Sequence, residues 1–237
     1  MQILKEFHLD DKCSYLDDLD TTTHYKLIEN CSSEHCQNLI ERGYRRFGKM
    51  FFRPVCTNCT ECQSIKIDVE SFKFSKSQRR VIKKGSKFKI IIQTPNLSQE
   101  HLDLFAKYHL FMKDKKDWKY NETKAQNYHN SFVDGHYDFG YEVLYFDEEK
   151  LIGVDLIDIL EDGISSIYFY YDPDYSQYSL GKYSLLNQIS IAKQYNKRWI
   201  YLGYYVRECS SLSYKSQYQP YLTLKGRPQE AEDFIWN

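Results

Sequence analysis

Three strand-forming stretches follow one another in the second half of this 237-residue chain, and only short polar segments separate them. They cover residues 140–146, 151–160 and 164–171. The two connecting segments, residues 147–150 and 161–163, have the length and polarity of hairpin turns. Strands joined by such short connections pair in antiparallel fashion, because a parallel pair requires a crossover of a dozen or more residues. We therefore expect an antiparallel meander.

Helix and strand patterns lie on both sides of this meander. The expected elements are a strand at residues 88–93, helices after Ser98 and at residues 122–134, and, beyond the meander, a helix at residues 182–195 and a strand at residues 199–206. The order strand, two helices, meander, helix, strand resembles that of an N-acetyltransferase-like (GNAT) domain. We therefore predict an α/β (α+β) fold with a mixed, largely antiparallel sheet over residues 88–237.

The first 87 residues carry a different pattern. The expected elements are a helix between Ser32 and Gly43, two short strands around Gly48, a strand at residues 64–69 and a basic helix between Ser75 and Gly85. The strand alternates strictly, so Ile65, Ile67 and Val69 should point inward and the intervening side chains toward solvent. We predict a small cysteine-bearing α+β domain at residues 1–87, followed by the larger domain at residues 88–237.

Positive charge is concentrated in residues 41–90, although the whole chain has a net charge of only −1. This block holds 14 Lys and Arg against four acids, a local net charge of +10, so the other residues carry −11. Such a concentration is typical of a surface that binds a polyanion, most often a nucleic acid. A merely solvated face and a site for an acidic side chain are the alternatives. The charges form two clusters: Arg42, Arg45, Arg46, Lys49 and Arg53, and then Lys76, Arg79, Arg80, Lys83, Lys84 and Lys87.

Aromatic residues interleave with the first of these clusters. They are Tyr44, Phe47, Phe51 and Phe52. Arginine contacts phosphate while an aromatic ring stacks on a base, so this mixture favours a nucleic-acid partner over a solvated face.

Three regularly spaced cysteines, Cys56, Cys59 and Cys62, lie in the middle of the basic block. Two C-x2-C steps share the middle cysteine, so this segment supplies at most three ligands to a tetrahedral site. Candidates for a fourth ligand are Cys13 and, behind it, Cys31, Cys36 and His35. We predict a zinc or iron–sulfur site at the three cysteines together with Cys13. The alternative is a group of small buried thiols.

Asp172 precedes Pro173 at the expected end of a strand, and Gly181 lies at the start of the next helix. A helix N-terminus presents backbone N–H groups and positive potential, so anions bind there. Acetyltransferases hold the coenzyme A pyrophosphate at this place with a Q/R-x-x-G-x-G/A loop. The segment at residues 177–182 is off register and lacks the second glycine, so coenzyme A is not expected. Asp172 acts either in a site or only as a turn former.

Neither a signal peptide nor a membrane-spanning segment is expected. Residues 1–12 contain no apolar core, and no stretch approaches the roughly 20 apolar residues that cross a bilayer. We expect a soluble cytoplasmic protein. In a reducing compartment its seven cysteines are thiols, metal ligands or catalysts rather than structural disulfides.

Together these segments resemble the bacterial aminoacyl-tRNA–protein transferases that modify N-terminal Asp and Glu, the aspartate/glutamate leucyltransferases. The motifs R-P-x-C-x2-C-x2-C at residues 53–62 and S-x-S-Q-R-R, matched at residues 75–80, are the most specific part. Further matching segments are residues 13–16, 40–48, 170–173, 179–183, 201–205 and 213–215. The resemblance covers nearly the whole chain. One departure is Lys76, which stands where arginine is common and keeps the charge without the fork.

The resemblance implies transfer of an amino acid from aminoacyl-tRNA to the α-amine of proteins that begin with Asp or Glu, a tagging step for proteolysis. The bacterial branch uses leucine and the eukaryotic relatives use arginine, so the short chain favours leucine, with arginine as the alternative. The ester is already activated, and an α-amine with a pKa of about 7.7–8.0 is partly neutral at cellular pH. Positioning can therefore supply much of the rate, and the chemistry requires no cofactor.

The resemblance also implies roles for particular residues. Asp172 is expected to orient or deprotonate the acceptor amine, and Tyr171, Tyr201 and Tyr204 to bind the oxyanion or the 3′ ribose. Tyr201 and Tyr204 can face one site only if a bulge near Gly203 interrupts the strand. The residues expected to bind substrates are Arg45, Arg46 and Arg53 for the acceptor carboxylate, the backbone of Gly181 and Lys182 for phosphates, Lys76, Gln78, Arg79, Arg80, Lys83 and Lys84 for the tRNA backbone, and Lys215 of the S-Y-K segment.

Two other functions fit parts of the pattern. A small-molecule N-acetyltransferase would share the expected fold, but the broken pyrophosphate loop argues against it. A zinc-knuckle RNA-binding protein without catalysis would explain the basic block and the cysteines, but it would leave the tyrosine-rich C-terminal half without a role. Transfer of labelled leucine from charged tRNA to a peptide that begins with Asp distinguishes all three.

Overall fold

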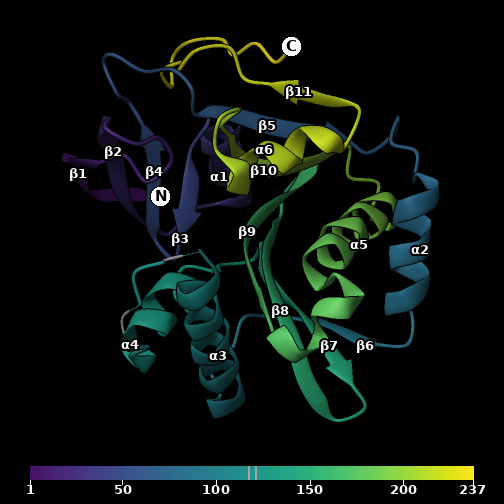
Figure 1. Cartoon of the computed structure of the whole chain (residues 1–237). Coiled ribbons are helices and arrows are strands. Elements are labelled where there is room, and N and C mark those ends of the chain that lie inside the picture. The colour runs from purple at the N-terminus through teal and green to yellow at the C-terminus, as the bar shows by residue number, and fades with distance from the viewer. Residues whose placement is uncertain (117, 121) are drawn as a thin grey trace.

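The computed structural model describes residues 1–116, 118–120 and 122–237. Its strands form two sheets, and the smaller one belongs to the N-terminal part of the chain (Figure 1). The smaller sheet has the order β1-β2-β4-β3 and is antiparallel throughout. Its strands are β1 (Gln2–Lys12), β2 (Asp20–Glu29), β3 (Arg45–Phe47) and β4 (Met50–Pro54).

The larger sheet has seven strands in the order β11-β5-β10-β9-β8-β7-β6. The strands are β5 (Gln63–Asp68), β6 (Lys89–Gln93), β7 (Gly140–Asp147), β8 (Lys150–Ile159), β9 (Gly163–Tyr171), β10 (Trp199–Tyr205) and β11 (Tyr221–Thr223). Neighbouring strands are antiparallel except for β9 and β10, which run parallel. The expected meander is confirmed as β7, β8 and β9, and the sheet is mixed and largely antiparallel as predicted.

Helices cover both faces of the larger sheet (Figure 1). One face carries α2 (Lys76–Gly85) and α5 (Leu180–Gln194), and the other carries α3 (Gln99–Lys116), α4 (Ala125–Tyr128) and the π-helix His129–Val133. The remaining helical segments are α1 (Ser33–Glu41), α6 (Ser210–Ser213) and the 3-10 helices Pro173–Tyr178 and Tyr214–Gln217. Among the described residues, none of the helices combines the length and apolar character needed to cross a bilayer.

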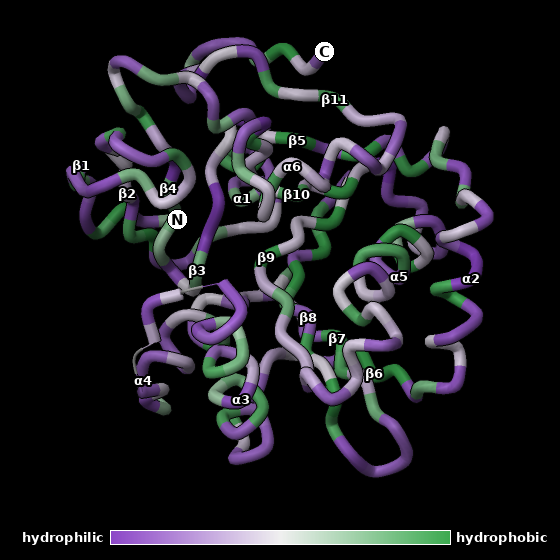
Figure 2. The backbone as a smooth tube through the Cα atoms, in the orientation of Figure 1, coloured by the Kyte–Doolittle hydropathy of each residue, from purple (hydrophilic) through white to green (hydrophobic). Residues whose placement is uncertain are grey.

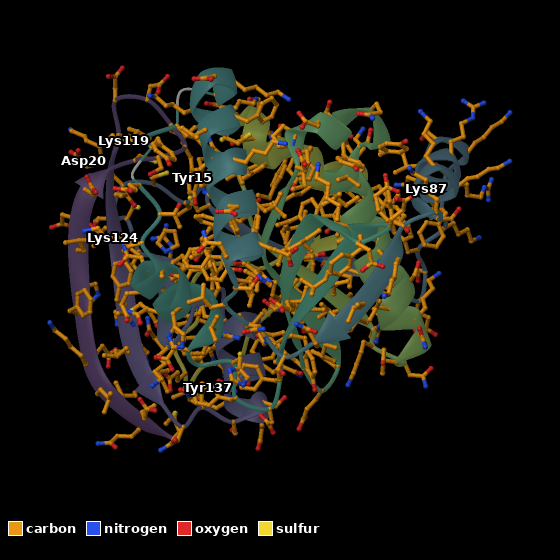
Figure 3. All side chains as sticks on the ribbon, turned by 90° about the horizontal axis from the view of Figure 1, so that it is seen from below. Tyr15, Asp20, Lys87, Lys119, Lys124 and Tyr137 are labelled. Atoms are coloured by element: carbon orange, nitrogen blue, oxygen red, sulfur yellow. The ribbon has the colours of Figure 1, made fainter. Side chains whose placement is uncertain are left out.

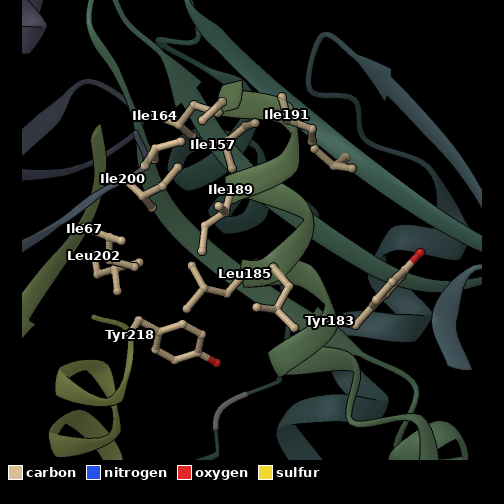
Figure 4. Close-up of a cluster of buried hydrophobic side chains, with 14 of the residues drawn as sticks. Ile67, Ile157, Ile164, Tyr183, Leu185, Ile189, Ile191, Ile200, Leu202 and Tyr218 are labelled. Carbon is tan, nitrogen blue, oxygen red and sulfur yellow. The ribbon is translucent and has the colours of Figure 1, made fainter. Parts of the chain in front are cut away.

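The main core lies between α5 and the larger sheet (Figure 4). Leu185, Leu186, Ile189 and Ala192 lie on one face of α5, as their helical spacing predicts, and all four are buried. They belong to the same apolar cluster as Ile200 of β10. Removal of this apolar surface from water fixes the position of α5 on the sheet.

The basic helix α2 begins and packs as its sequence predicts. The Ser75 hydroxyl accepts a hydrogen bond from the backbone N–H of Gln78, and the Gln78 side chain accepts one from the N–H of Ser75. Gly85 lies against the ring of Tyr183 on α5, where an added Cβ would come within 2.5 Å of a ring carbon. The charged residues of α2 are exposed, and Figure 2 shows strongly hydrophilic residues along this helix.

The boundary predicted at residue 87 does not coincide with the boundary between the two sheets. β5 pairs with β10 and β11 in the larger sheet, so the chain passes from one sheet to the other between Pro54 and Gln63. The expectation that β5 is half exposed is wrong. Ser64 and Lys66 are buried as well, because α1 covers this side, and the Lys66 Nζ donates to Glu41 at 3.0 Å.

Candidate functional site

The ladder between the parallel strands β9 and β10 is short. It runs from the pair Trp199 and Gly163 to the pair Tyr201 and Ser165. Beyond that point β9 remains paired with β8, and β10 remains paired with β5. The two strands therefore separate, and carbonyl groups on their facing edges need other partners. We call this region, formed by residues 166–167 of β9 and 202–204 of β10, the strand split.

Arg45 of β3 fills the strand split from the N-terminal part of the chain. Its guanidinium donates to the carbonyl oxygens of Ser166 at 2.9 Å, Ile167 at 2.8 Å and Leu202 at 3.4 Å. Gly203 permits this approach, because a Cβ there would lie 1.9 Å from Nη1 of Arg45. Gly203 also has a φ of +71°, and the expected bulge in β10 lies at this point.

Lys215 is the second cation at the strand split. Its side chain is buried, and its Nζ donates to the carbonyl oxygen of Tyr204 at 2.5 Å. Its ionisable neighbours are the guanidinium of Arg45 from β3 and the thiol of Cys209 from the turn before α6. Burial, reinforced by the charge of Arg45, holds the pKa of Lys215 well below its ordinary value. Lys215 therefore loses its proton more readily than an exposed lysine does.

Tyr201 and Tyr204 do not face an open site, although the bulge between them exists. The Tyr201 hydroxyl donates to the carboxylate of Glu41 and lies 3.1 Å from Oδ1 of Asp162. The Tyr204 hydroxyl donates to the carbonyl oxygen of Phe52 at 3.1 Å. Both tyrosines are buried, and their hydroxyls attach β10 to the N-terminal part of the chain. These two hydroxyls were expected to bind an oxyanion. In the structure they are already bonded to partners within the chain.

Arg46 and Arg53 also have internal partners. Arg46 is buried and forms an ion pair with Asp158 of β8, with 2.8 Å between its Nε and the carboxylate. Arg53 donates to the carbonyl oxygens of Arg42 at 3.0 Å and Pro228 at 2.8 Å. The structure therefore places neither arginine where the carboxylate of an acceptor protein can reach it.

Asp172 lies at the end of β9 and is 2% exposed. Its carboxylate pairs with Lys107 at 2.5 Å and Lys150 at 2.7 Å, and it accepts from the N–H of Asp174. Burial alone would raise the pKa of Asp172, but hydrogen bonds from the two lysines and from this N–H lower it. A carboxylate with a lowered pKa is a weak proton acceptor. The neighbouring Tyr171 is half-buried, which raises the pKa of its hydroxyl.

The N-terminus of α5 is exposed at Gly181 and Lys182. An added Cβ at Gly181 would meet no atom within 4 Å, so a ligand has room at this position. The backbone N–H of Lys182, however, already donates to the carbonyl oxygen of Ser179 at 2.9 Å. The expected phosphate site therefore lacks one of the two N–H groups assigned to it.

The outer face of α2 carries the second basic cluster. Lys76, Arg79, Arg80, Lys83 and Lys84 are all exposed. Among the residues that the structure describes, none of these five forms an ion pair with a carboxylate. Figure 3 shows long side chains of α2 projecting from the body of the protein near Lys87. Gln78 is different, because its side chain is committed to the capping box.

The four cysteines expected to hold a metal lie near one another but do not converge. Burial, and then the neighbouring thiols of Cys13, Cys56 and Cys59, raise the pKa of Cys62 to about 12. Within residues 1–116, 118–120 and 122–237, no group of three His, Cys, Asp or Glu side chains is placed to hold a metal ion. Arg227 donates to the carbonyl oxygens of Cys56 and Cys59 and so supports this loop. The metal site stays a prediction.

A hollow of about 770 Å³ lies away from the strand split. It is lined by the β1–β2 hairpin and the cysteine loop, and four aspartates contribute to its wall: Asp10, Asp11, Asp18 and Asp20. Negative charge of this density repels phosphate and carboxylate groups. The hollow therefore suits neither RNA nor an acidic protein terminus.

Two family models match this chain. The model described as "Arginine-tRNA-protein transferase, N terminus" matches residues 11–80, and the model described as "Arginine-tRNA-protein transferase, C terminus" matches residues 100–225. The chain belongs to the arginine-tRNA-protein transferase family. An aspartate/glutamate leucyltransferase of Campylobacter jejuni is 54% identical over 96% of each chain. A protein of the same name from Helicobacter hepaticus is 41% identical over 98% of this chain and 97% of its own.

These findings confirm the resemblance based on the cysteine and S-x-S-Q-R-R segments. Solved structures are less similar. L-PGS from Bacillus licheniformis has a TM-score of 0.46 and 13% identity, covering 61% of this chain and 47% of its own.

One buried polar network of this family member was not predicted from the sequence. Asp155 of β8 is fully buried and accepts from Ser184 Oγ at 2.5 Å and from Gln188 Nε2 at 2.9 Å. Gln188 Nε2 also lies 3.2 Å from Ser166 Oγ at the strand split. Burial raises the pKa of Asp155 to about 7, against the opposing effect of these hydrogen bonds. An acid within the apolar run 151–160 is the signal that would have identified it.

Proposed function

We propose that this protein transfers leucine from charged tRNA to the α-amine of proteins that begin with Asp or Glu. The observation that carries the proposal is 54% identity, over 96% of the chain, to a relative named aspartate/glutamate leucyltransferase. The product begins with leucine, which marks it for degradation through the N-degron pathway. Because charged tRNA is the donor, we expect the reaction in the cytoplasm.

The reaction is the aminolysis of an ester. The acceptor amine attacks the leucyl carbonyl carbon, a C–N bond forms, and the C–O bond to the 3′ ribose breaks. The amine loses one proton, and the ribose oxygen that leaves gains one, so the net change is the transfer of a single proton from nitrogen to oxygen. The protein contributes by holding both substrates, by stabilising the oxyanion and by moving this proton.

The strand split is the place in the structure that best suits this chemistry. Arg45 brings a positive charge that favours a developing oxyanion. Lys215 lies beside it with a lowered pKa and no carboxylate partner among the described residues, so it can accept the proton from the amine and return it to the ribose oxygen. We assign this role to Lys215 rather than to Asp172, whose carboxylate is already held by Lys107 and Lys150.

The outer face of α2 suits the phosphate backbone of the tRNA. Its five exposed cations have no internal partner among the described residues, so they lose only water when they meet phosphate. The same helix packs on α5, whose exposed N-terminus at Gly181 adds positive potential beside it.

The element order β7, β8, β9, α5, β10 supports an N-acetyltransferase-like arrangement of the larger sheet and its helices. A metal at the four cysteines is a separate proposal that the chemistry of the ester does not require. Metal analysis of protein purified without chelator tests it, and a zinc or iron content near zero would argue against it.

A transfer assay tests the function itself. Labelled leucyl-tRNA and arginyl-tRNA are each offered with peptides that begin with Asp, Glu or Ala. We expect leucine to be transferred to the Asp and Glu peptides and not to the Ala peptide. Transfer of arginine in place of leucine would make arginine the donor. No transfer from either tRNA would overturn the proposal.

A further inference from the structure

The strands of the smaller sheet align four residues in one row across its width. Phe7 of β1 is opposite Tyr25 of β2, Tyr25 is opposite Phe52 of β4, and Phe52 is opposite Arg45 of β3. Directly opposite residues of antiparallel strands point to the same face of a sheet. Three aromatic side chains therefore lead across the sheet to Arg45, the residue that fills the strand split.

The rings of this row are in contact and are all partly exposed. The centroids of Phe7 and Tyr25 are 5.2 Å apart and stacked, and those of Tyr25 and Phe52 are 6.0 Å apart. Phe47 extends the group, because its ring lies 5.4 Å from that of Phe52. We call Phe7, Tyr25, Phe52 and Phe47 the aromatic row.

The face that bears the aromatic row carries positive charge and no carboxylate in its three central rows. Besides the aromatic row and Arg45, these rows contain Lys5, Leu9, Thr23, Leu27, Met50 and Pro54. The Lys5 Nζ lies 4.9 Å from the centroid of the Phe7 ring. Aromatic rings with nearby cations and without acids suit nucleobases and phosphates.

The opposite face of the same sheet is different, because the C-terminal segment of the chain covers it. Lys26 pairs there with Glu230, and Arg53 donates to the carbonyl oxygen of Pro228. His24 lies 2.8 Å from a carboxylate oxygen of Glu6. Lys26 and Arg53 of that face therefore have partners within the chain, whereas the aromatic row is left partly open.

We propose that the aromatic row binds the unpaired 3′ end of the charged tRNA and leads its acylated terminus to Arg45 at the strand split. The inference rests on the proposed function and adds a subsite to it. A four-stranded sheet of this kind offers stacking positions for two or three bases. The cations of α2 hold phosphates elsewhere on the same RNA, because that helix lies at the far side of the larger sheet (Figure 1).

Binding of a short single-stranded RNA that matches the tRNA 3′ end, labelled with a fluorescent adenine analogue, tests the proposal. Phe7→Leu and Tyr25→Leu are each expected to weaken binding about tenfold and to reduce quenching of the analogue. Phe7→Trp keeps the ring and is expected to bind as wild type does. Tyr195→Leu, which removes an aromatic residue that is 52% exposed on another surface, is the matched control.

Three outcomes would overturn the proposal. The leucine variants bind the RNA as tightly as wild type, Phe7→Leu and Phe7→Trp weaken it equally, or the leucine variants raise the KM for the acceptor peptide and leave RNA binding unchanged. The RNA assay needs no catalysis, so it separates this inference from the proposed function. If wild-type protein transfers leucine and the leucine variants bind RNA normally, only the role of the aromatic row in RNA binding is refuted, and the proposed function stands.

Discussion

The two basic clusters of residues 41–90 are alike in sequence and opposite in the structure. The arginines of the first cluster point inward and hold backbone carbonyl groups or, at Arg46, a buried carboxylate. The cations of the second cluster lie on α2 and point into solvent. To bind a partner, a guanidinium of the first cluster must give up its internal hydrogen bonds, which costs free energy. An exposed cation of the second cluster gives up only hydrogen bonds to water. The first cluster therefore mainly builds the molecule, with Arg45 at the strand split also assigned to the proposed site, and the second cluster remains available to a partner.

Removing a cation from the first cluster tests the structural side of this comparison and has the largest expected effect. Arg46→Met leaves Asp158 buried without its partner, so the free energy of unfolding should fall by about 3–5 kcal/mol. Urea denaturation measures this fall. Arg80→Met on α2 is the matched control and should change the same quantity by less than about 0.5 kcal/mol. A loss of the same size in both variants would erase the distinction.

Asp155 extends this comparison to a buried acid. Among the described residues, no cation forms an ion pair with it. Its pKa of about 7 lies above the ordinary 3.8, so its protonated form stabilises the fold below about pH 4, and this contribution is lost as the pH rises through 7. The loss is on the order of 4 kcal/mol, and Asp155→Asn should remove it. Denaturation at pH 4 and pH 8 measures the difference. Equal pH dependence in both proteins would contradict the expectation.

Asp172 provides a control, because its contribution to stability depends on pH in the opposite direction. Its pKa is lowered, so its contribution to stability is present above its ordinary pKa and is lost as the pH falls through the lowered one. Asp172→Asn should therefore make the protein less sensitive to acid, without changing the behaviour between pH 5 and pH 8.

A substitution at Lys215 tests whether this buried lysine, which pairs with no carboxylate among the described residues, takes part in the reaction. Arginine stays protonated at neutral pH and cannot accept the proton of the amine, so Lys215→Arg should lower turnover at least about 100-fold. The KM for charged tRNA should change little. Single-turnover rates between pH 6 and pH 9 measure the effect, with Asp172→Asn expected within a few-fold of wild type. A large loss in Asp172→Asn and none in Lys215→Arg would return the role to Asp172.

The second cluster gives the mildest expected effect. Arg79→Ala combined with Arg80→Ala should weaken the binding of charged tRNA about tenfold and reduce the slope of log affinity against log salt by about 1.5. Unfolding free energy and turnover at saturating tRNA should stay at wild-type values. Titrations at several salt concentrations measure the slope, and an unchanged slope removes these arginines from the phosphate contacts.

Much of the fold follows from local patterns. The three strands of the meander, the helix at 180–194 and the capped basic helix were all predictable, because alternation, helical spacing and capping residues act over a few positions. The place of β5 was not predictable. Its alternation indicates a strand, but pairing with β10 joins residues more than 130 positions apart, and nothing in the local sequence specifies that partner.

The candidate site divides in the same way. The cations of α2 were expected to contact the tRNA backbone. They are exposed on the polar side of the helix, and the contact itself stays a prediction. Tyr201, Tyr204, Arg46 and Arg53 were expected at substrates and instead bond within the chain. A residue's type states which bonds it can form, and only its neighbours determine whether those bonds are already made.

The sequence by itself determined the family, the meander, the helices and the concentration of positive charge, because each is carried by short stretches of residues. The tertiary structure alone decided that β9 and β10 separate, that Arg45 and Lys215 meet there, and that three aromatic rings align toward Arg45. Strand register and the burial of charge depend on contacts between distant segments. Folding the chain is what brings those segments together.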